Sequence, residues 1–258
     1  MRKTGHKVDA TSLRSALDDY AAELAKTPAR RADQIRKQNP AFFTGNAEMA
    51  LAVARLEYLF GEPIDALKQK LGAVLAEVPV AVDMGGLVLP GIATAFLGSA
   101  LVLGDDKLAA WLSGIDESVY NDPDGEMSPG ASHYLKAYQA AASGDPKALD
   151  AAVRKFRSVL VPEKLLEPRA EMALYKPLAD LLEALAKRDQ TAFDAAWKAE
   201  GDAWKKRYAR ASEVANFDGL LDLESLGLAV LARRAGLQVS DTNPYAPLEL
   251  LDSGSKKK

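Results

Sequence analysis

Ser132 and His133 place a hydroxyl group beside an imidazole, the residue types that a hydrolase uses as nucleophile and base. The chain has no Gly-x-Ser-x-Gly segment that would hold such a serine on a strained turn between a strand and a helix. The glycine patterns that bind phosphate groups, Gly-x-Gly-x-x-Gly and Gly-x4-Gly-Lys-Ser/Thr, are also missing. We therefore expect His133 to pack or cap near the start of a helix, and we predict no catalytic residues and no enzyme activity.

Metal chemistry is limited by the residue types that the chain contains. It has no cysteine and only two histidines, which excludes thiolate-bound zinc, iron–sulfur clusters and three-histidine sites. Asp122, Asp124 and Gly125 match the third, fifth and sixth positions of an EF-hand calcium loop, but this register puts Tyr120 and Ala131 where two carboxylates are needed. The sequence predicts a turn that displays carboxylates, with no metal and no cofactor.

Aromatic and basic residues gather on the segment from Asp189 to Arg210. Four aromatic residues lie close to one helical face of this segment: Phe193, Trp197, Trp204 and Tyr208. The basic residues near its end are Lys205, Lys206, Arg207 and Arg210. Such a combination can grip single-stranded nucleic acid, but cations also favour the negative end of a helix dipole. We favour a core stripe and expect no nucleic-acid partner, since one short cluster is too small for a nucleic-acid footprint.

Charge is distributed unevenly along the 258 residues, although the net charge is only −3. Residues 1–40 carry +4, residues 41–150 carry −9 and residues 151–258 carry +2. A region as acidic as 41–150 repels nucleic acid and membrane surfaces and attracts basic partners. The alternative is a solvated face that only aids solubility.

Apolar residues recur at helical spacing along nearly the whole chain. The segment 46–60 has apolar residues at intervals of three and four, with charged residues such as Arg55 mostly on the opposite side. A second helix is expected to open at Pro63 and to end before Pro79. The only candidate strand is Val78–Val82, which is too isolated to form a sheet.

Residues 85–104 are twenty residues without a charge, and they include five glycines and Pro90. Pro90 fits the first position of a helix, which leaves about fourteen residues before a stop at Gly104. We expect a buried central helix here rather than a membrane span. The basic start of the chain runs into polar residues instead of an apolar core, so we expect no secretory signal and a cytoplasmic protein.

Three segments share the plan of helix, tight turn, aspartate and second helix. Their turns are Gly104-Asp105-Asp106, Gly144-Asp145-Pro146 and Arg188-Asp189. Glycine takes the left-handed conformation that stops one helix, and the aspartate accepts the free amides that start the next. The spacing near forty residues is typical of stacked helical hairpins. The sequence therefore predicts an all-α protein, an irregular α-solenoid-like array of antiparallel hairpins, with a single domain over 1–252 and a disordered basic tail at 253–258.

Four segments stand out in the last eighty residues: LADLLEALAKR (178–188), DQTAFDAAW (189–197), FDGLLDLESLGLAVLARRAG (217–236) and NPYAPLELL (243–251). These segments resemble the end of bacterial immunity proteins of polymorphic toxin systems. The immunity protein 49 family ends in a similar way, with an apolar helix, a glycine and a Pro-Tyr-x-Pro-x-x-Leu-Leu segment. Here these positions are Leu223, Glu224, Leu228, Leu231, Ala232, Gly236, Pro244, Tyr245, Pro247, Leu250 and Leu251. The ending also resembles the helical immunity proteins paired with polymorphic nuclease effectors.

This resemblance implies an inhibitor that binds a cognate toxin and blocks it without catalytic groups. If the toxin is a nuclease with a basic active site, the acidic region is suited to occupy it as a nucleic-acid mimic. We expect the contact residues to be five acidic ones: Asp116, Glu117, Asp122, Asp124 and Glu126. Two alternatives remain open, a helical scaffold unrelated to toxins and an enzyme without a known motif. The enzyme predicts a deep pocket that holds convergent polar groups with perturbed pKa values.

Overall fold

The computed structural model describes residues 1–2, 5–86, 90–116, 119, 128–209 and 219–252. All regular secondary structure in these ranges is helical, which confirms the predicted all-α class. The helices are α1 (Ala10–Leu24), α2 (Thr27–Arg36), α3 (Pro40–Phe60), α4 (Ile64–Leu75), α5 (Glu77–Asp83), α6 (Pro90–Leu103), α7 (Asp106–Ser113), α8 (Pro129–Ser143), α9 (Pro146–Val159), the 3-10 turn η2 (Pro162–Lys164), α10 (Pro168–Lys187), α11 (Gln190–Arg207), α12 (Leu223–Arg234) and α13 (Glu249–Asp252).

The three predicted turns join α6 to α7, α8 to α9 and α10 to α11. Gly104, Gly144 and Arg188 have φ angles of 72°, 75° and 52°, in the left-handed region that ends a helix. The aspartate that follows each of them caps the next helix, and Asp145 accepts the amides of Lys147 and Ala148 at 2.8 and 3.3 Å. The turn chemistry thus fixes where six of the helices begin or end.

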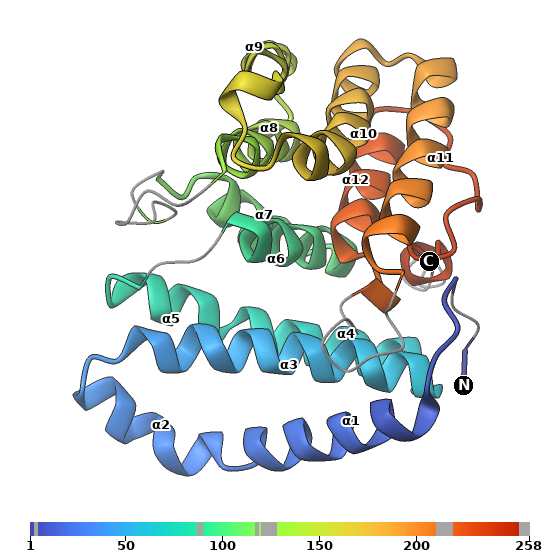
Figure 1. Ribbon diagram of the computed structural model, residues 1–258. Coiled ribbons are helices and arrows are strands. Elements are labelled where there is room, and N and C mark those ends of the chain that lie inside the picture. The colour runs from blue at the N-terminus through green and yellow to red at the C-terminus, as the bar shows by residue number, and fades with distance from the viewer. Residues whose placement is uncertain (3–4, 87–89, 117–118, 120–127, 210–218, 253–258) are drawn as a thin grey trace, which may run out of the picture.

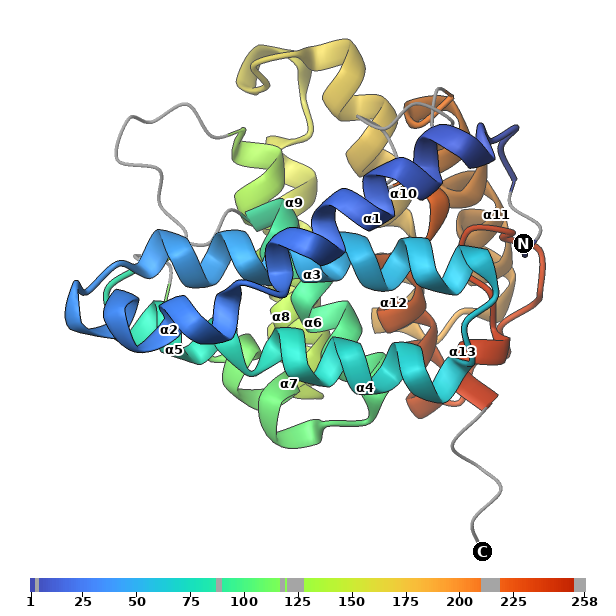
Figure 2. The same cartoon turned by 90° about the horizontal axis from the view of Figure 1, so that it is seen from below.

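The helices stack in layers (Figure 1). α1 and α2 form the outermost layer and pack on α3, which also contacts α4 and α5. Figure 2 shows α1 crossing α3. The hairpins α6–α7 and α8–α9 follow, with α10 and α11 beside them. α12 then returns along α6, a contact between elements far apart in the sequence. The expected solenoid is not confirmed, because in a solenoid each repeat contacts only its neighbours.

The buried central helix predicted from the uncharged stretch is α6. It begins at Pro90 and ends at Leu103, and Phe96, Leu97 and Ala100 on it are fully buried in the main core. Among the described residues, none of the helices is long and apolar enough to cross a membrane. A second, smaller core forms between α1 and α3 around Leu13, Leu17 and Leu56.

Two segments differ from the sequence-based expectations. The candidate strand Val78–Val82 lies within α5, where Pro79 occupies the first turn and its missing amide would have had no partner inside the helix. The hairpin around Arg188-Asp189 is longer than the segment LADLLEALAKR (178–188), because α10 begins at Pro168 and carries Pro177 inside it. The acidic loop at 121–125 and the tail at 253–258 lie outside the described residues.

Candidate functional site

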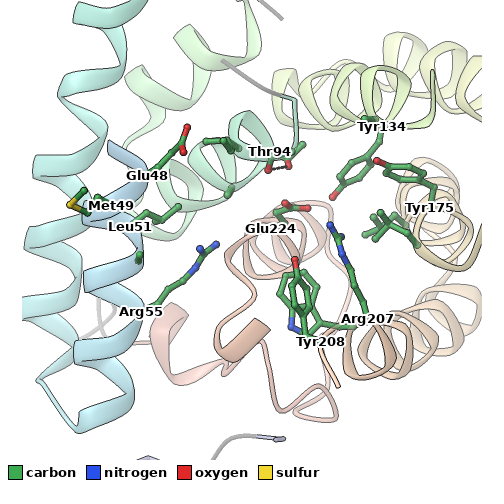
Figure 3. Close-up of a pocket in the computed structure, with 18 of the residues that line it drawn as sticks. Glu48, Met49, Leu51, Arg55, Thr94, Tyr134, Tyr175, Arg207, Tyr208 and Glu224 are labelled. Atoms are coloured by element: carbon green, nitrogen blue, oxygen red, sulfur yellow. Dashed lines mark hydrogen bonds between the residues drawn. The ribbon is translucent and has the colours of Figure 1, made fainter. Parts of the chain in front are cut away.

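A cavity of about 680 Å³ opens between the lower layers and the upper hairpins. Its walls come from α1, α3, α6, α8, α10, α11 and α12, so it is built where the layers meet. The polar residues that line it are Tyr20, Glu48, Arg55, Thr94, Tyr134, Tyr175, Arg207, Tyr208 and Glu224 (Figure 3). Such a volume lies within the range of ordinary small-molecule sites.

Close packing of α6 on α12 positions Glu224 in the cavity wall. A Cβ atom on Gly98 of α6 would lie 2.2 Å from the carbonyl oxygen of Leu223, and a Cβ atom on Gly227 would lie 2.5 Å from the Cα atom of Gly98. Glycine is required at both positions, because any side chain would push the helices apart. The hydroxyl of Tyr138 on α8 also donates to the carbonyl oxygen of Glu224 at 2.9 Å. These contacts hold the first turn of α12 against α6 and α8.

The Glu224 carboxyl group is an acid with a strongly perturbed pKa. Burial, and then the negative charge of Asp222, raise the pKa of Glu224 to about 7, against the opposing influence of Thr94, Arg207 and Arg55. The side chain is nevertheless only partly buried, because it faces the cavity. It is therefore an acid near neutrality that a ligand in the cavity can reach.

Two further carboxyl groups lie behind Glu224 and are almost fully buried. Asp222, with 0% exposure, caps α12 by accepting the amide of Ser225 at 2.8 Å, and burial raises its pKa to about 6. Glu200, with 2% exposure, accepts from the side-chain amide of Asn243 at 3.3 Å. Burial, followed by the charge of Asp222, raises the pKa of Glu200 well above its usual range.

Two arginines approach the cavity from facing helices. Arg55 on α3 is 8% exposed, although the helical pattern places it on the polar side of its segment. Arg207 ends α11 and its guanidinium lies 5.0 Å from the ring centre of Tyr208. In Figure 3 both guanidinium groups point toward the space beside Glu224. Their positive charges lower the pKa of Glu224 and of Asp222, which places them within electrostatic reach of both acids.

Tyr134 contributes a hydroxyl group that has no hydrogen-bond partner among the described residues. The residue is 3% exposed and its ring packs against Tyr138, Phe156 and Tyr175. Figure 3 shows the hydroxyl pointing into the cavity, toward Arg207. A buried hydroxyl without a partner costs free energy, so this group is a vacant donor in the cavity wall.

The chemistry of the wall fits binding of an anion better than nucleophilic catalysis. Among the described residues that line the cavity there is no serine, cysteine or histidine. Two guanidinium groups and several phenol groups line it, together with the carboxyl groups of Glu48 and Glu224 and the hydroxyl of Thr94. No group of three acidic or histidine side chains in the described ranges is placed to hold a metal ion. A cavity that holds a carboxyl group with a raised pKa is nevertheless present, a feature that sequence patterns did not reveal.

Comparison with protein families gives a match to the model described as immunity protein 49, over residues 47–250. The chain belongs to the immunity protein 49 family. No curated protein and no solved structure gives a significant match. The matched range contains every cavity-lining residue except Tyr20 and Gly45.

The segments that resemble the immunity protein 49 family are structural. Tyr245 is 1% exposed, its amide is bound by the Asn243 side chain at 3.0 Å, and its carbonyl oxygen accepts the amide of Asp222 at 2.7 Å. The Asn-Pro-Tyr segment therefore fixes the start of α12. Leu223, Leu228 and Ala232 on α12 are buried as well.

Of the five acidic residues that we expected to contact a partner of this immunity protein 49 family member, the structure describes one. Asp116 is exposed after α7, whereas Glu117, Asp122, Asp124 and Glu126 lie outside the described residues. His133 lies in the first turn of α8, where its Nδ1 atom is 2.9 Å from the carbonyl oxygen of Pro129, as expected for a packing or capping role.

The predicted aromatic stripe of α11 is confirmed in the core, with an addition. Phe193, Trp197 and Trp204 are buried, but Trp204 and Tyr208 also line the cavity. The helical period identified the buried face. It carried no information about the other helices that meet this face, so the cavity was missed.

Proposed function

We propose that this protein neutralises a cognate bacterial toxin by binding it and covering its active site or substrate surface. The observation that carries the proposal is the immunity protein 49 match over residues 47–250. A stack of helices with two packed cores suits this role, because an inhibitor needs a stable surface and no catalytic group. We further propose that it acts in the cytoplasm.

We propose that the contact surface lies in the acidic part of the chain. Residues 41–150 carry a net charge of −9, and the exposed carboxylates there include Glu62, Asp65, Asp83 and Asp116. A toxin with a basic active site, such as a nuclease, would associate rapidly with such a surface. The proposed contact residues remain Asp116, Glu117, Asp122, Asp124 and Glu126.

Co-expression with the product of the adjacent gene tests the proposal. We expect cells to survive, and we expect toxin and inhibitor to elute together from a sizing column. Death of the cells together with separate elution would contradict the proposal and would favour a scaffold unrelated to toxins.

A charge-reversal variant tests the location of the interface. Replacing Asp122, Asp124 and Glu126 by lysine should slow association with the toxin about tenfold or more at low salt and flatten its salt dependence, because charges at the edge of an interface act mainly on the encounter rate. Stopped-flow mixing at several salt concentrations measures both effects.

The control variant carries the same change in total charge on another part of the chain. It replaces the exposed residues Glu163, Asp202 and Asp241 by lysine. Equal slowing in the two variants would show that net charge alone matters and would remove the interface from the acidic loop.

A further inference from the structure

We propose that the cavity binds a small organic anion, a molecule with one carboxylate or phosphate group on an apolar or aromatic body. The cavity lies between the helix layers. The proposal goes beyond toxin neutralisation and does not depend on it.

The first argument is the placement of positive charge. Arg55 and Arg207 come from facing helices and their guanidinium groups point toward the same space (Figure 3). In the described part of the chain Arg207 forms no ion pair, and its guanidinium group lies over the ring of Tyr208. A guanidinium group pairs with two oxygens of a carboxylate or phosphate at once, which makes it the preferred residue for such ligands.

The second argument is the vacant hydroxyl of Tyr134. Its oxygen atom is buried and has no hydrogen-bond partner in the described ranges, whereas the Tyr138 hydroxyl one turn later donates to a backbone carbonyl group. Buried polar groups are nearly always paired with protein, water or ligand, so an unpaired donor aimed into a cavity is available to bind an acceptor atom on a ligand. An anionic oxygen beside Arg207 would satisfy it.

The remaining wall of the cavity is apolar and suits a ligand with an apolar body. Ile92, Leu174, Leu178 and Trp204 line the cavity, and its volume of about 680 Å³ holds a molecule larger than inorganic phosphate. Inorganic anions alone would leave most of this wall without contact. We therefore expect a ring or chain to accompany the charged group.

Glu224 makes binding dependent on protons. The charged and titratable groups that face it are Glu48 and Arg55 on α3, Tyr134 and Tyr138 on α8, Tyr175 on α10, Glu200 and Arg207 on α11, and its neighbour Asp222. An anion placed among them would favour the protonated form of Glu224, so its binding should take up a proton. Affinity should therefore rise as the pH falls from 8 to 6.

Calorimetric titration with matched aromatic probes tests the proposal. Phenylacetate and phenyl phosphate carry the two candidate anionic groups, while benzyl alcohol and benzylamine present the same ring without charge and with a positive charge. We expect at least one anion to bind about tenfold or more tightly than both controls, since ionic hydrogen bonds are the stronger class. The better anion identifies the group, and phenylacetate, whose own charge is constant from pH 6 to 8, should bind more tightly at pH 6.

Two variants assign the binding to this cavity. Arg207→Gln should weaken the better anion about tenfold, and Tyr134→Phe should weaken it about fivefold. The control is Lys205→Gln, which removes the same charge from the same exposed helix end but does not line the cavity. It should leave the affinity unchanged.

Three results would overturn the proposal. The first is that the anions bind no more tightly than benzyl alcohol. The second is that both Arg207→Gln and Tyr134→Phe bind the anion as tightly as the natural protein does. The third is that no probe binds, while Arg207→Gln and Tyr134→Phe both abolish toxin binding. This result would mean that the cavity accepts part of the toxin and not a small anion.

Discussion

Tyr134 and Tyr138 lie one helical turn apart on α8, yet of their two hydroxyl groups only that of Tyr138 has a hydrogen-bond partner among the described residues. We predict that Tyr138→Phe lowers the free energy of unfolding by about 1 kcal/mol, because it removes a buried hydrogen bond to the Glu224 carbonyl group. Tyr134→Phe should leave that free energy unchanged or slightly higher, because it removes an unpaired polar atom. Urea denaturation of both variants makes the comparison, and a loss in Tyr134→Phe as large as that in Tyr138→Phe would show that the first hydroxyl is paired.

The raised pKa of Glu224 predicts a pH-dependent stability. The folded protein holds this proton up to about pH 7, whereas the unfolded chain releases it near its ordinary pKa of 4.5. Folding is therefore favoured by protonation, and the contribution of Glu224 is lost as the pH rises from about 4.5 through 7. We predict that Glu224→Gln is more stable than the natural protein at pH 8, by about 2 kcal/mol, and nearly equal to it at pH 4.5.

Urea midpoints measured at intervals between pH 4.5 and 8 test this prediction. The difference between the two proteins contains the titration of Glu224 together with its coupling to Asp222, whose pKa is raised to about 6 and falls in the same window. Stability curves that run parallel over the whole range would mean that the folded pKa of Glu224 is ordinary.

Sequence patterns revealed little of the site at the residue scale. Arg55 belongs to a segment whose charged residues alternate with an apolar face, so the pattern predicts an exposed side chain. The structure buries it, because α3 is covered on more than one side by α1, α4 and α5. Periodicity within one helix reports the widest apolar face and cannot report how many neighbours that helix has.

At the scale of elements, the crossing of α6 and α12 supports both the core and the cavity. We predict that Gly98→Ala lowers the free energy of unfolding by about 2–3 kcal/mol, since its Cβ atom would overlap the Leu223 carbonyl group at 2.2 Å. Moving the start of α12 would also displace Glu224. Gly72→Ala is the matched control, a helical glycine with nothing within 4 Å of the added atom, and it should gain about 0.5–1 kcal/mol.

Thermal and urea unfolding of the two alanine variants measure these changes. Equal stabilities would mean that α6 and α12 can separate at no cost, and the account of how Glu224 is positioned would then be wrong.

Turns and helix ends were the most predictable elements. The Gly104, Gly144 and Arg188 turns, the start of α6 at Pro90 and the start of α8 at Pro129 follow from local chemistry, which acts within a few residues. The return of α12 to α6 was not predictable, because the glycines that permit it are far apart in the chain and do not form a local pattern. The segment Val78–Val82 in α5 was the only candidate strand, because its β-branched valines favour a strand locally.

At the scale of the whole molecule, the ending of the chain was informative. Many of the residues that resemble the immunity protein 49 family are buried in and around α12 and the Asn243–Tyr245 segment. The match to the family covers residues 47–250, which is more of the chain than these segments. These positions maintain the fold and say little about the partner. The cavity could not be predicted, because seven helices distant in sequence meet to form it.

The proposed function requires that the protein neutralises a cognate toxin by binding and covering it, so that inhibition is stoichiometric and not catalytic. Titrating the purified chain into a fixed amount of purified toxin, with residual toxin activity as the readout, tests this claim most directly. We predict a linear loss of activity that reaches its end point at one equivalent and does not change with incubation time. A loss of toxin activity that grows with time when much less than one equivalent of this protein is present would contradict the claim. Catalysis would then be sought in the cavity that contains Glu224.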